Sequence, residues 1–434
     1  MPAPPRMTGG VEWGILAAMS VGLEAVRAAA GRIGGAGGVY RSPLHHSVQL
    51  SRLCGCDVYC KLDHLQITGS FKERGALNRL LLLSADERQR GVICASAGNH
   101  ALAVAYHGGR LGIPVTVCMP RWAPLIKVSN CRSFGADVVF AGETFVEAYD
   151  FALAEAQRTG RRFIPGFDDP DVVAGAATAG LEIFEDLPDA EVVVVPVGGA
   201  GLIAGVGLVA RELGVRAKVV GVEPEHCASL TAAIAAGRPV RVASRPTLAD
   251  GLAVAEVGRV PLEVILGPPR RVDDIVLVNE PQIARAVLRL MELEKMVVEG
   301  AGAASLAGLL KLLDSPGGET LRGRKVVLLL CGGNIDVTVL NRIIDRGLAA
   351  DGRLCRVTCR TSDRPGSLNR MTSVFARCQA SVMEIFHDRF FGPADVADVA
   401  ITAVLETRDA AHGAEVVAAL RAEGIDVAHV DGAT

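Results

Sequence analysis

Short valine-rich segments that alternate with amphipathic segments constrain the fold of this chain more than any other feature. Helical patterns such as APLIKVSNCRSFG (123–135) and EPQIARAVLRLMELEK (280–295) separate the apolar runs. Short apolar strands separated by helices are typical of parallel sheets that are covered on both faces. The pattern therefore predicts an α/β protein, with strands at GVICAS (91–96), PVTVCMP (114–120), ADVVFAG (136–142), AEVVVVPVG (190–198), AKVVGVEP (217–224) and KVVLLLCGG (325–333).

The composition and net charge of the chain exclude some classes of binding partner. Apolar residues make up 50% of the 434 residues and aromatic residues only 4%, so the cores must be mainly aliphatic. A formal net charge of −3, spread along the chain, gives no electrostatic footprint for nucleic acid or an anionic membrane. Segment 11–33 is apolar but carries charges and glycines, so we expect a packed helix and no membrane span. The eleven cysteines lie mostly in apolar runs, which favours reduced thiols and a cytoplasmic location.

The alternating pattern changes near residue 350. The segments that follow predict a strand, a helix, two strands, a helix and a strand, at 353–360, 365–379, 381–390, 396–407, 414–424 and 425–430. This βαββαβ order is that of a ferredoxin-like unit. We therefore expect two domains, 1–350 and 351–434.

Three loops that contain glycine follow expected strands, at SAGNH (96–100), GGAG (198–201) and CGGN (331–334). Ligands of parallel sheets bind at the carboxyl ends of strands, so these loops can meet in one crevice. GGAG opens a helix, whose first N–H groups suit a phosphate. The spacing Gly199-x-Gly201-x3-Gly205 is also close to a dinucleotide fingerprint, which leaves a nicotinamide cofactor open at this point.

The stretch LQITGSFKERGALNRLL (65–81) places a lysine at the start of a helix. Ser70 and Glu73 have the spacing of a capping box, which predicts that the helix begins at Ser70. A cation in the first turn is disfavoured by about 0.3 to 1 kcal/mol, because it meets the positive end of the helix dipole. Lys72 is therefore either a solvated surface lysine or a lysine whose charge is altered.

Seven motifs, in order, resemble the threonine dehydratase (threonine ammonia-lyase) family of fold-type II pyridoxal-phosphate enzymes. They are GSFKERGA, SAGNHA, FDDPDVVAG, VPVGGAGLIAG, GVEPE, VEGAGAA and CGGNID, and the resemblance covers about residues 35–345. It implies a two-lobed, tryptophan-synthase-β-like fold of parallel and mixed sheets flanked by helices, with a smaller lobe at about 60–160. The tail, with DRPGSL (363–368), is similar to an ACT domain, a small-ligand regulatory module.

The resemblance also implies roles for single residues. Lys72 forms the Schiff base with pyridoxal 5'-phosphate and abstracts the α-proton, and its place at a helix N-terminus agrees with a lowered pKa. The other implied contacts are Phe71 and Asn99 to the cofactor ring and its 3'-hydroxyl, Gly198, Gly199, Ala200, Gly201 and Leu202 to its phosphate, Cys331 to its pyridine nitrogen, and Ser96, Ala97, Gly98, Asn99 and His100 to the substrate carboxylate.

The implied reaction is the dehydrative deamination of L-threonine, and of L-serine, to a 2-oxo acid and ammonia. A serine racemase or a hydroxyaspartate dehydratase are alternatives on the same fold, and a nicotinamide oxidoreductase or a non-catalytic amino-acid sensor are alternatives outside it. Racemases of this fold carry serine where this chain has Ala97, which has no proton to give, so elimination is favoured. The ACT-like tail implies an amino-acid effector and a homo-oligomer.

A cation site is a further open alternative. Related enzymes bind a cation beside GVEP, through the residue matching Glu223 and a carboxylate six residues on, where this chain has Ser229. A monovalent or divalent cation at Glu223 therefore stays open.

Overall fold

The computed structural model describes residues 21–270, 272–389 and 398–432. A six-stranded sheet in the order β1-β2-β10-β7-β8-β9 forms the centre of the body, and all its neighbours pair in parallel except β1 with β2. Its strands are β1 (Leu44–His46), β2 (Asp57–Lys61), β7 (Val192–Pro196), β8 (Lys218–Pro224), β9 (Asp274–Val278) and β10 (Lys325–Leu329). The mixed α/β architecture predicted from the sequence is confirmed.

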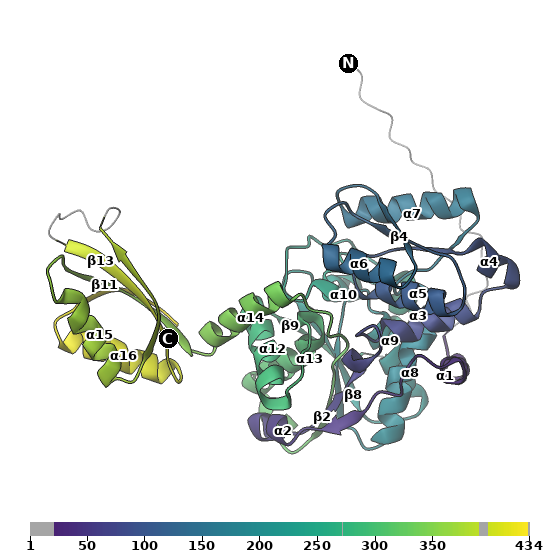
Figure 1. Cartoon of the computed structure of the whole chain (residues 1–434). Helices are drawn as coiled ribbons and strands as arrows, with labels where there is room; N and C mark the ends of the chain where they lie inside the picture. Colours follow the sequence, from purple (N-terminus) through teal and green to yellow (C-terminus); the bar gives the residue numbers. More distant parts are fainter. Residues whose placement is uncertain (1–20, 271, 390–397, 433–434) are drawn as a thin grey trace.

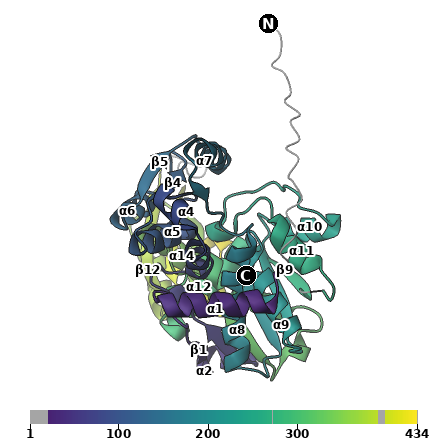
Figure 2. The same cartoon turned by 90° about the vertical axis from the view of Figure 1, so that its right-hand side faces the viewer.

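Helices cover both faces of this sheet, which explains why β7 is apolar and buried along its whole length. One face packs against α1 (Leu23–Ala36), α8 (Pro170–Asp186), α9 (Gly201–Glu212) and α11 (Arg259–Leu266). Figure 2 shows α1, in purple, lying across this side of the molecule. The other face packs against α2 (Val48–Cys54), α12 (Glu280–Glu294), α13 (Gly300–Asp314) and α14 (Val337–Ala350).

A smaller parallel sheet in the order β5-β4-β3-β6 lies at the upper right of Figure 1. Its strands are β3 (Val92–Ala95), β4 (Val115–Met119), β5 (Asp137–Phe140) and β6 (Arg162–Phe163). The helices around it are α3 (Lys72–Leu81), α4 (Ala85–Arg90), α5 (Asn99–Arg110), α6 (Leu125–Ser133) and α7 (Phe145–Thr159). The remaining short elements of the body are α10 (Ser229–Ala236), η1 (Asp63–Leu65), η2 (Asp250–Leu252) and η3 (Gly318–Leu321).

The C-terminal unit is a four-stranded antiparallel sheet in the order β12-β13-β11-β14 with two helices packed on one face. It consists of β11 (Leu354–Ser362), α15 (Ser367–Arg377), β12 (Ser381–Asp388), β13 (Asp398–Glu406), α16 (Ala410–Ala422) and β14 (Asp426–Asp431). The predicted βαββαβ fold is confirmed, and Figure 1 shows the unit joined to the body after α14. Parts of three predicted segments lie outside the described residues, at 11–20, 390 and 396–397. The domain limits 1–350 and 351–434 stay a prediction.

Two further observations concern the described residues as a whole. None of the helices within them is long and apolar enough to cross a membrane. All eleven cysteines are free thiols, and ten of them are buried.

Candidate active site

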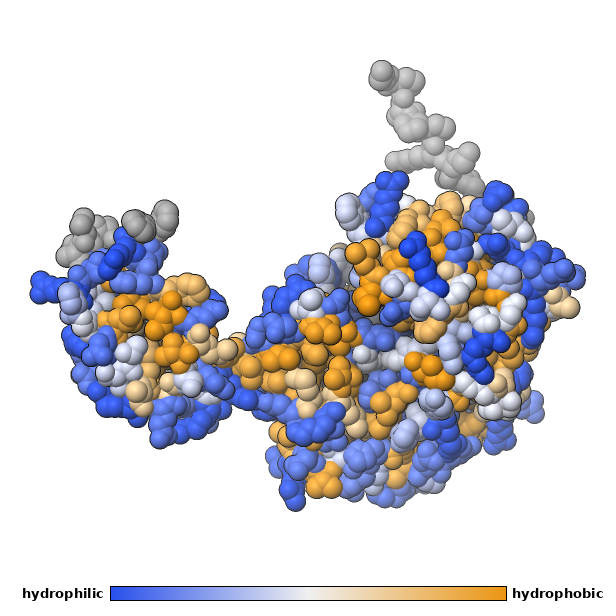
Figure 3. Space-filling view, in the orientation of Figure 1, coloured by the Kyte–Doolittle hydropathy of each residue, from blue (hydrophilic) through white to orange (hydrophobic). Residues whose placement is uncertain are grey.

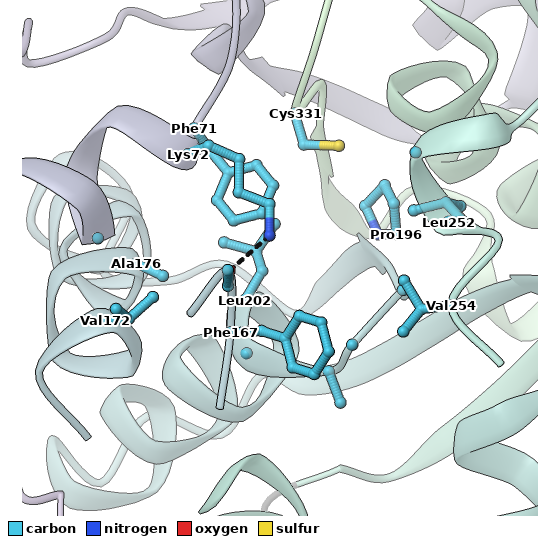
Figure 4. A pocket seen from close by; sticks show the side chains of 17 residues that line it. Phe71, Lys72, Phe167, Val172, Ala176, Pro196, Leu202, Leu252, Val254 and Cys331 are labelled. Carbon is cyan, nitrogen blue, oxygen red and sulfur yellow. Dashed lines mark hydrogen bonds between the residues drawn. The ribbon is translucent and has the colours of Figure 1, made fainter. Parts of the chain in front are cut away.

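One pocket lies where the start of α3, the start of α9 and the end of β10 meet (Figure 4). Both sheet strands that end there, β7 and β10, deliver their carboxyl ends, as expected for a parallel sheet. The pocket is lined by Phe71, Lys72, Gly75, Gly166, Phe167, Val172, Ala176, Pro196, Gly198, Gly199, Ala200, Gly201, Leu202, Gly251, Leu252, Val254 and Cys331. It thus brings together all the residues predicted to hold the cofactor except Asn99.

Lys72 is the first residue of α3, and its side chain extends into the pocket. Its Nζ donates a hydrogen bond to the carbonyl oxygen of Gly166 at 2.7 Å and lies 5.1 Å from the centroid of the Phe71 ring. Burial lowers the pKa of Lys72 to about 8, and Cys331 opposes this shift in part. Burial is therefore the main physical cause of the lowered pKa, where the sequence had pointed to the helix end. A neutral amine is the nucleophilic form of a lysine.

The predicted capping box at the start of α3 is wrong. The residue at the N-cap is Phe71, no side chain caps the helix, and the buried Ser70 hydroxyl has no hydrogen-bond partner in the structure. Glu73 instead accepts a hydrogen bond from the Thr68 N–H, and its other oxygen lies 3.1 Å from Nε2 of His107. Residues outside the first turn of α3 thus engage Glu73, which the local sequence pattern had assigned to the helix cap.

The glycine loop before α9 packs closely against Phe167 and lines the pocket. A Cβ at Gly199 would overlap the ring of Phe167, so this position requires glycine. Ala200 has φ 70°, in the left-handed region, although it is not glycine. The first N–H groups of a helix have no partner within the helix, so those at the start of α9 can bind a phosphate.

Cys331 follows β10 and places its sulfur in the pocket (Figure 4). Burial raises the pKa of this thiol, and the nearby Glu299 raises it further. The side chain is therefore a neutral thiol at physiological pH. Such a group can face a ring nitrogen without giving it a charge.

The loop predicted to hold the substrate carboxylate lies beside the pocket, at the start of α5. Ser96 Oγ accepts a hydrogen bond from the Gly98 N–H at 3.1 Å, and Ala97 packs partly against the core of the smaller sheet. His100 is buried, with Nε2 2.9 Å from the carbonyl oxygen of Ile164, and burial lowers its pKa to about 4. Its ring is thus neutral and engaged, so we expect only the His100 backbone N–H to serve a carboxylate.

Glu223 lies near the end of β8 and caps α10. Its Oε1 accepts from the Leu230 N–H at 2.6 Å, and its Oε2 accepts from the backbone and the hydroxyl of Thr231. Among the described residues there is no group of three or more His, Cys, Asp or Glu side chains that could hold a metal ion. The structure thus shows Glu223 as a cap of α10, and a cation at Glu223 stays a prediction.

Two side chains at the site were not assigned from the sequence. Phe167 lies against the glycine loop, and Glu299 accepts a hydrogen bond from Asn99 Nδ2 at 2.7 Å. Both belong to motifs that were singled out, FDDPDVVAG and VEGAGAA. The only signal in the sequence was therefore the motif as a whole.

Comparisons with known proteins agree with this geometry. The family model described as pyridoxal-phosphate dependent enzyme matches residues 36–332. The L-threonine ammonia-lyase of Thermotoga maritima is 44% identical over 389 residues, which cover 90% of this chain and 95% of that protein. The processed form of threonine deaminase isoform 2 from Solanum lycopersicum is 35% identical with a TM-score of 0.69, over 75% of this chain and 86% of that one. Maize serine racemase is 29% identical, also with a TM-score of 0.69, over 76% and 98%.

An amine with a lowered pKa that faces a glycine turn at a helix start defines a site for an aldehyde cofactor with a phosphate arm. The chain belongs to the family of pyridoxal-phosphate-dependent enzymes. Its resemblance to threonine ammonia-lyases, predicted from seven motifs, is confirmed. The residues present fit the cofactor, because the start of α9 has no side-chain cap that would occupy its first N–H groups and Cys331 supplies a neutral partner.

Proposed function

We propose that this protein is an L-threonine ammonia-lyase, which converts L-threonine to 2-oxobutyrate and ammonia and L-serine to pyruvate and ammonia. The observation that carries the proposal is the Lys72 amine in a glycine-loop pocket. Support comes from the 44% identity to the Thermotoga maritima L-threonine ammonia-lyase over 90% of the chain.

In the proposed reaction Lys72 carries the cofactor and handles the proton. Bound pyridoxal phosphate supplies an electron sink, which acidifies the α-carbon of the substrate. Nζ of Lys72 accepts the α-proton, a role that suits an amine whose pKa is about 8. The N–H groups at the start of α9 hold the phosphate, and those at the start of α5 hold the substrate carboxylate.

The β-hydroxyl then leaves with one proton as water, so that the elimination removes the α-hydrogen and the hydroxyl together. Hydrolysis of the product takes up one water and releases the 2-oxo acid and ammonia. Cys331 retains its proton, so it offers the ring nitrogen a weak S–H donor and no charge. The resulting sink is weaker, which favours prompt loss of the hydroxyl over transfer of the amino group. Ala97 gives no proton to the opposite face of the substrate, which favours elimination over racemisation.

Release of 2-oxo acid from hydroxyamino acids tests this proposal. The protein is purified with pyridoxal phosphate and assayed with L-threonine, L-serine and 3-hydroxyaspartate. We expect 2-oxobutyrate from L-threonine, pyruvate from L-serine in large excess over D-serine, and little product from 3-hydroxyaspartate. Cofactor binding without any 2-oxo acid from L-threonine would contradict the assignment, and D-serine comparable to pyruvate would favour the racemase.

We propose further that residues 351–434 form a regulatory domain that binds an amino acid, in a homo-oligomer. The N-cap of α15 is Gly366, and no side chain caps this helix, so its first N–H groups suit a carboxylate. Figure 3 shows apolar surface over α14, where Val337 is 78% exposed, and such a surface suits contact with another subunit. The free thiols support a cytoplasmic location.

Truncation after Asp351 tests the regulatory role. Asp351 pairs with Arg289 at 2.7 Å, so this cut keeps the contact that anchors the end of α14 to α12. We expect near-normal activity at saturating substrate and loss of any response to isoleucine or valine. A full-length protein that shows no kinetic or calorimetric response to amino acids would leave the unit a structural role only.

A further inference from the structure

The side-chain amide of Asn99 is held from both sides. Its Nδ2 donates to Glu299 Oε1 at 2.7 Å, and its Oδ1 accepts from Asn334 Nδ2 at 2.9 Å. The three residues come from the start of α5, the start of α13 and the loop after β10. This small network therefore joins three segments that surround the pocket.

A backbone carbonyl fixes the direction of every hydrogen bond in this network. Nδ2 of Asn334 also donates to the carbonyl oxygen of Thr68 at 2.6 Å, and a carbonyl oxygen can only accept. The atom that Asn334 presents to Asn99 is therefore the nitrogen, so Asn99 must answer with its oxygen. The Asn99 nitrogen then faces Glu299 and keeps a second N–H beyond the one that Glu299 accepts.

Glu299 is itself anchored to the loop that carries Cys331. Its backbone N–H donates to the carbonyl oxygen of Gly332 at 3.1 Å, and a Cβ at Gly332 would overlap Oε1 of Glu299. Glu299 occupies the N-cap of α13, yet its side chain does not cap that helix. The carboxyl group is thus used for Asn99 and not for the helix.

The charged groups around Glu299 affect the pKa of its carboxyl group. Burial raises the pKa of its carboxyl to about 7, Asp250 raises it too, and the bond from Asn99 lowers it. Lys127 of α6 also lowers it and pairs with Asp250 of η2 at 3.2 Å, while the neutral thiol of Cys331 lies close by. The Glu299 carboxyl therefore keeps a proton more readily than an ordinary glutamate. Glutamine copies that protonated form.

We infer that Glu299 and Asn334 are positioning residues, which lock the Asn99 amide in one orientation and keep one of its N–H groups available for the phenolic oxygen of the cofactor. The inference rests on the proposed function, because it takes pyridoxal phosphate as the ligand of the pocket. A donor N–H favours the phenolic oxygen in its deprotonated form. Losing either partner frees the amide to rotate and weakens that preference.

Three variants test the lock: Glu299→Ala, Glu299→Gln and Asn334→Ala. The readouts are the dissociation constant of pyridoxal phosphate and the pH midpoint of its visible absorbance, both measured without substrate. We expect Glu299→Ala and Asn334→Ala to weaken cofactor binding about tenfold, the size expected for one lost hydrogen bond in a polar network, and to raise the pH midpoint. Glu299→Gln should stay within about threefold of the parent at pH 7, since its carbonyl still accepts from Asn99.

The matched control is Glu294→Gln. Glu294 has a side chain that is 5% exposed and accepts from Ser47 Oγ at 2.5 Å, away from the pocket. It should leave both readouts unchanged. Unchanged spectra and affinity in folded Glu299→Ala and Asn334→Ala would overturn the inference, and so would a Glu299→Gln variant as impaired as Glu299→Ala.

Circular dichroism establishes that each variant is folded, and Asn334→Ala carries the test if Glu299→Ala is not. L-threonine turnover of the parent protein is measured in parallel. A parent that binds the cofactor but releases no 2-oxo acid contradicts the proposed function alone, because the spectral readouts still report on the lock.

Discussion

Four helices that begin at or beside the pocket differ from three helices that begin elsewhere in how their first turns are satisfied. Away from the pocket, α4, α7 and α12 each begin with a reciprocal capping box, built on Ser84, Thr144 and Asn279. At the pocket, α3, α5, α9 and α13 begin without any side-chain cap, at Phe71, Gly98, Ala200 and Glu299. The first three helix ends are called closed, because a side chain caps them. The other four are called open, because no side chain caps them.

An open end costs stability and makes a ligand site. Replacing a capping side chain by alanine typically costs about 0.5 to 2 kcal/mol. The same N–H groups, when left without a partner, attract phosphate and carboxylate groups. Four uncapped helix ends therefore lie where negatively charged parts of the cofactor and substrate are proposed to bind.

The largest effect is expected at the open end of α3. Lys72→Ala should abolish threonine turnover and leave the fold intact, because alanine is well tolerated in a helix and no cap is lost. Turnover is measured as 2-oxobutyrate release, and folding by circular dichroism. The control is Lys311→Ala in α13, since Lys311 pairs with Glu225 at 3.2 Å on the surface and should not matter for turnover. Turnover and a normal cofactor spectrum in Lys72→Ala would show that the uncapped helix ends at this pocket do not serve the active site.

Closing an open end should exchange function for stability. A Cβ at Gly98 meets no atom within 4 Å, so Gly98→Ser fits and its hydroxyl can cap α5. We expect the KM for L-threonine to rise about 10- to 100-fold, the effect of losing a hydrogen bond to a charged group. Stability should rise by only a few tenths of a kcal/mol, since glycine is already a fair N-cap. Gly98→Ala, which adds bulk without an acceptor, should raise KM less.

The rate of cofactor attachment should report the pKa of Lys72. Only the neutral amine reacts, and a pKa of about 8 means that its fraction falls below pH 8. We therefore expect the rate with apoprotein to fall about tenfold per pH unit below 8 and to level off above it. Absorbance in a stopped-flow instrument measures this rate. A midpoint near the ordinary lysine value of 10.5 would mean that burial leaves the amine unperturbed.

Opening a closed end should affect stability alone. Thr144 Oγ1 accepts a hydrogen bond from the Glu147 N–H at 3.3 Å, at the start of α7. Thr144→Ala should lower the free energy of unfolding by about 0.5 to 2 kcal/mol in urea titrations. The kcat and KM for L-threonine should not change. A change in KM without a change in stability would break the distinction between the two kinds of helix end.

The smallest effect is expected at Ala200. Its φ of 70° is unfavourable for an L-residue, and glycine relieves this strain while it loses more conformational freedom on folding. Ala200→Gly should therefore raise the free energy of unfolding by no more than about 1 kcal/mol. Urea titration of the apoprotein measures this difference. A loss of stability would show that the alanine side chain, which is buried, contributes more by packing.

The larger part of the fold could be predicted from the sequence, because strands that are buried on both faces are continuous apolar runs in the sequence. VVVVP and KVVLL are such runs, and they became β7 and β10. DVYCK became β2 although no strand was predicted there, since its polar residues hide the pattern. Neighbouring strands in the structure, rather than the residues of β2 themselves, decide that this segment is extended.

The site was less accessible to sequence reasoning. The resemblance pointed to Lys72 and Cys331, and the structure places both in one pocket. Glu299 could not be assigned, because its role depends on Asn99, which lies two hundred residues away in the chain. The capping box failed for the same reason, since His107 and the Thr68 N–H engage Glu73. Contacts with residues that are distant in the sequence determine the roles of these side chains.

The pairing of β2 with β10 has a consequence for how the chain folds during its synthesis on the ribosome. These two strands are neighbours in the larger sheet, although nearly the whole body of the chain is synthesised between them. The smaller sheet, β3 to β6, is built from one continuous segment and can form while translation continues. The larger sheet must wait for β10, and until then β2 and β7 expose apolar faces that chaperones bind. A nascent chain that stops before Cys331 therefore carries the cofactor lysine and the glycine loop but has no complete pocket in which to use them.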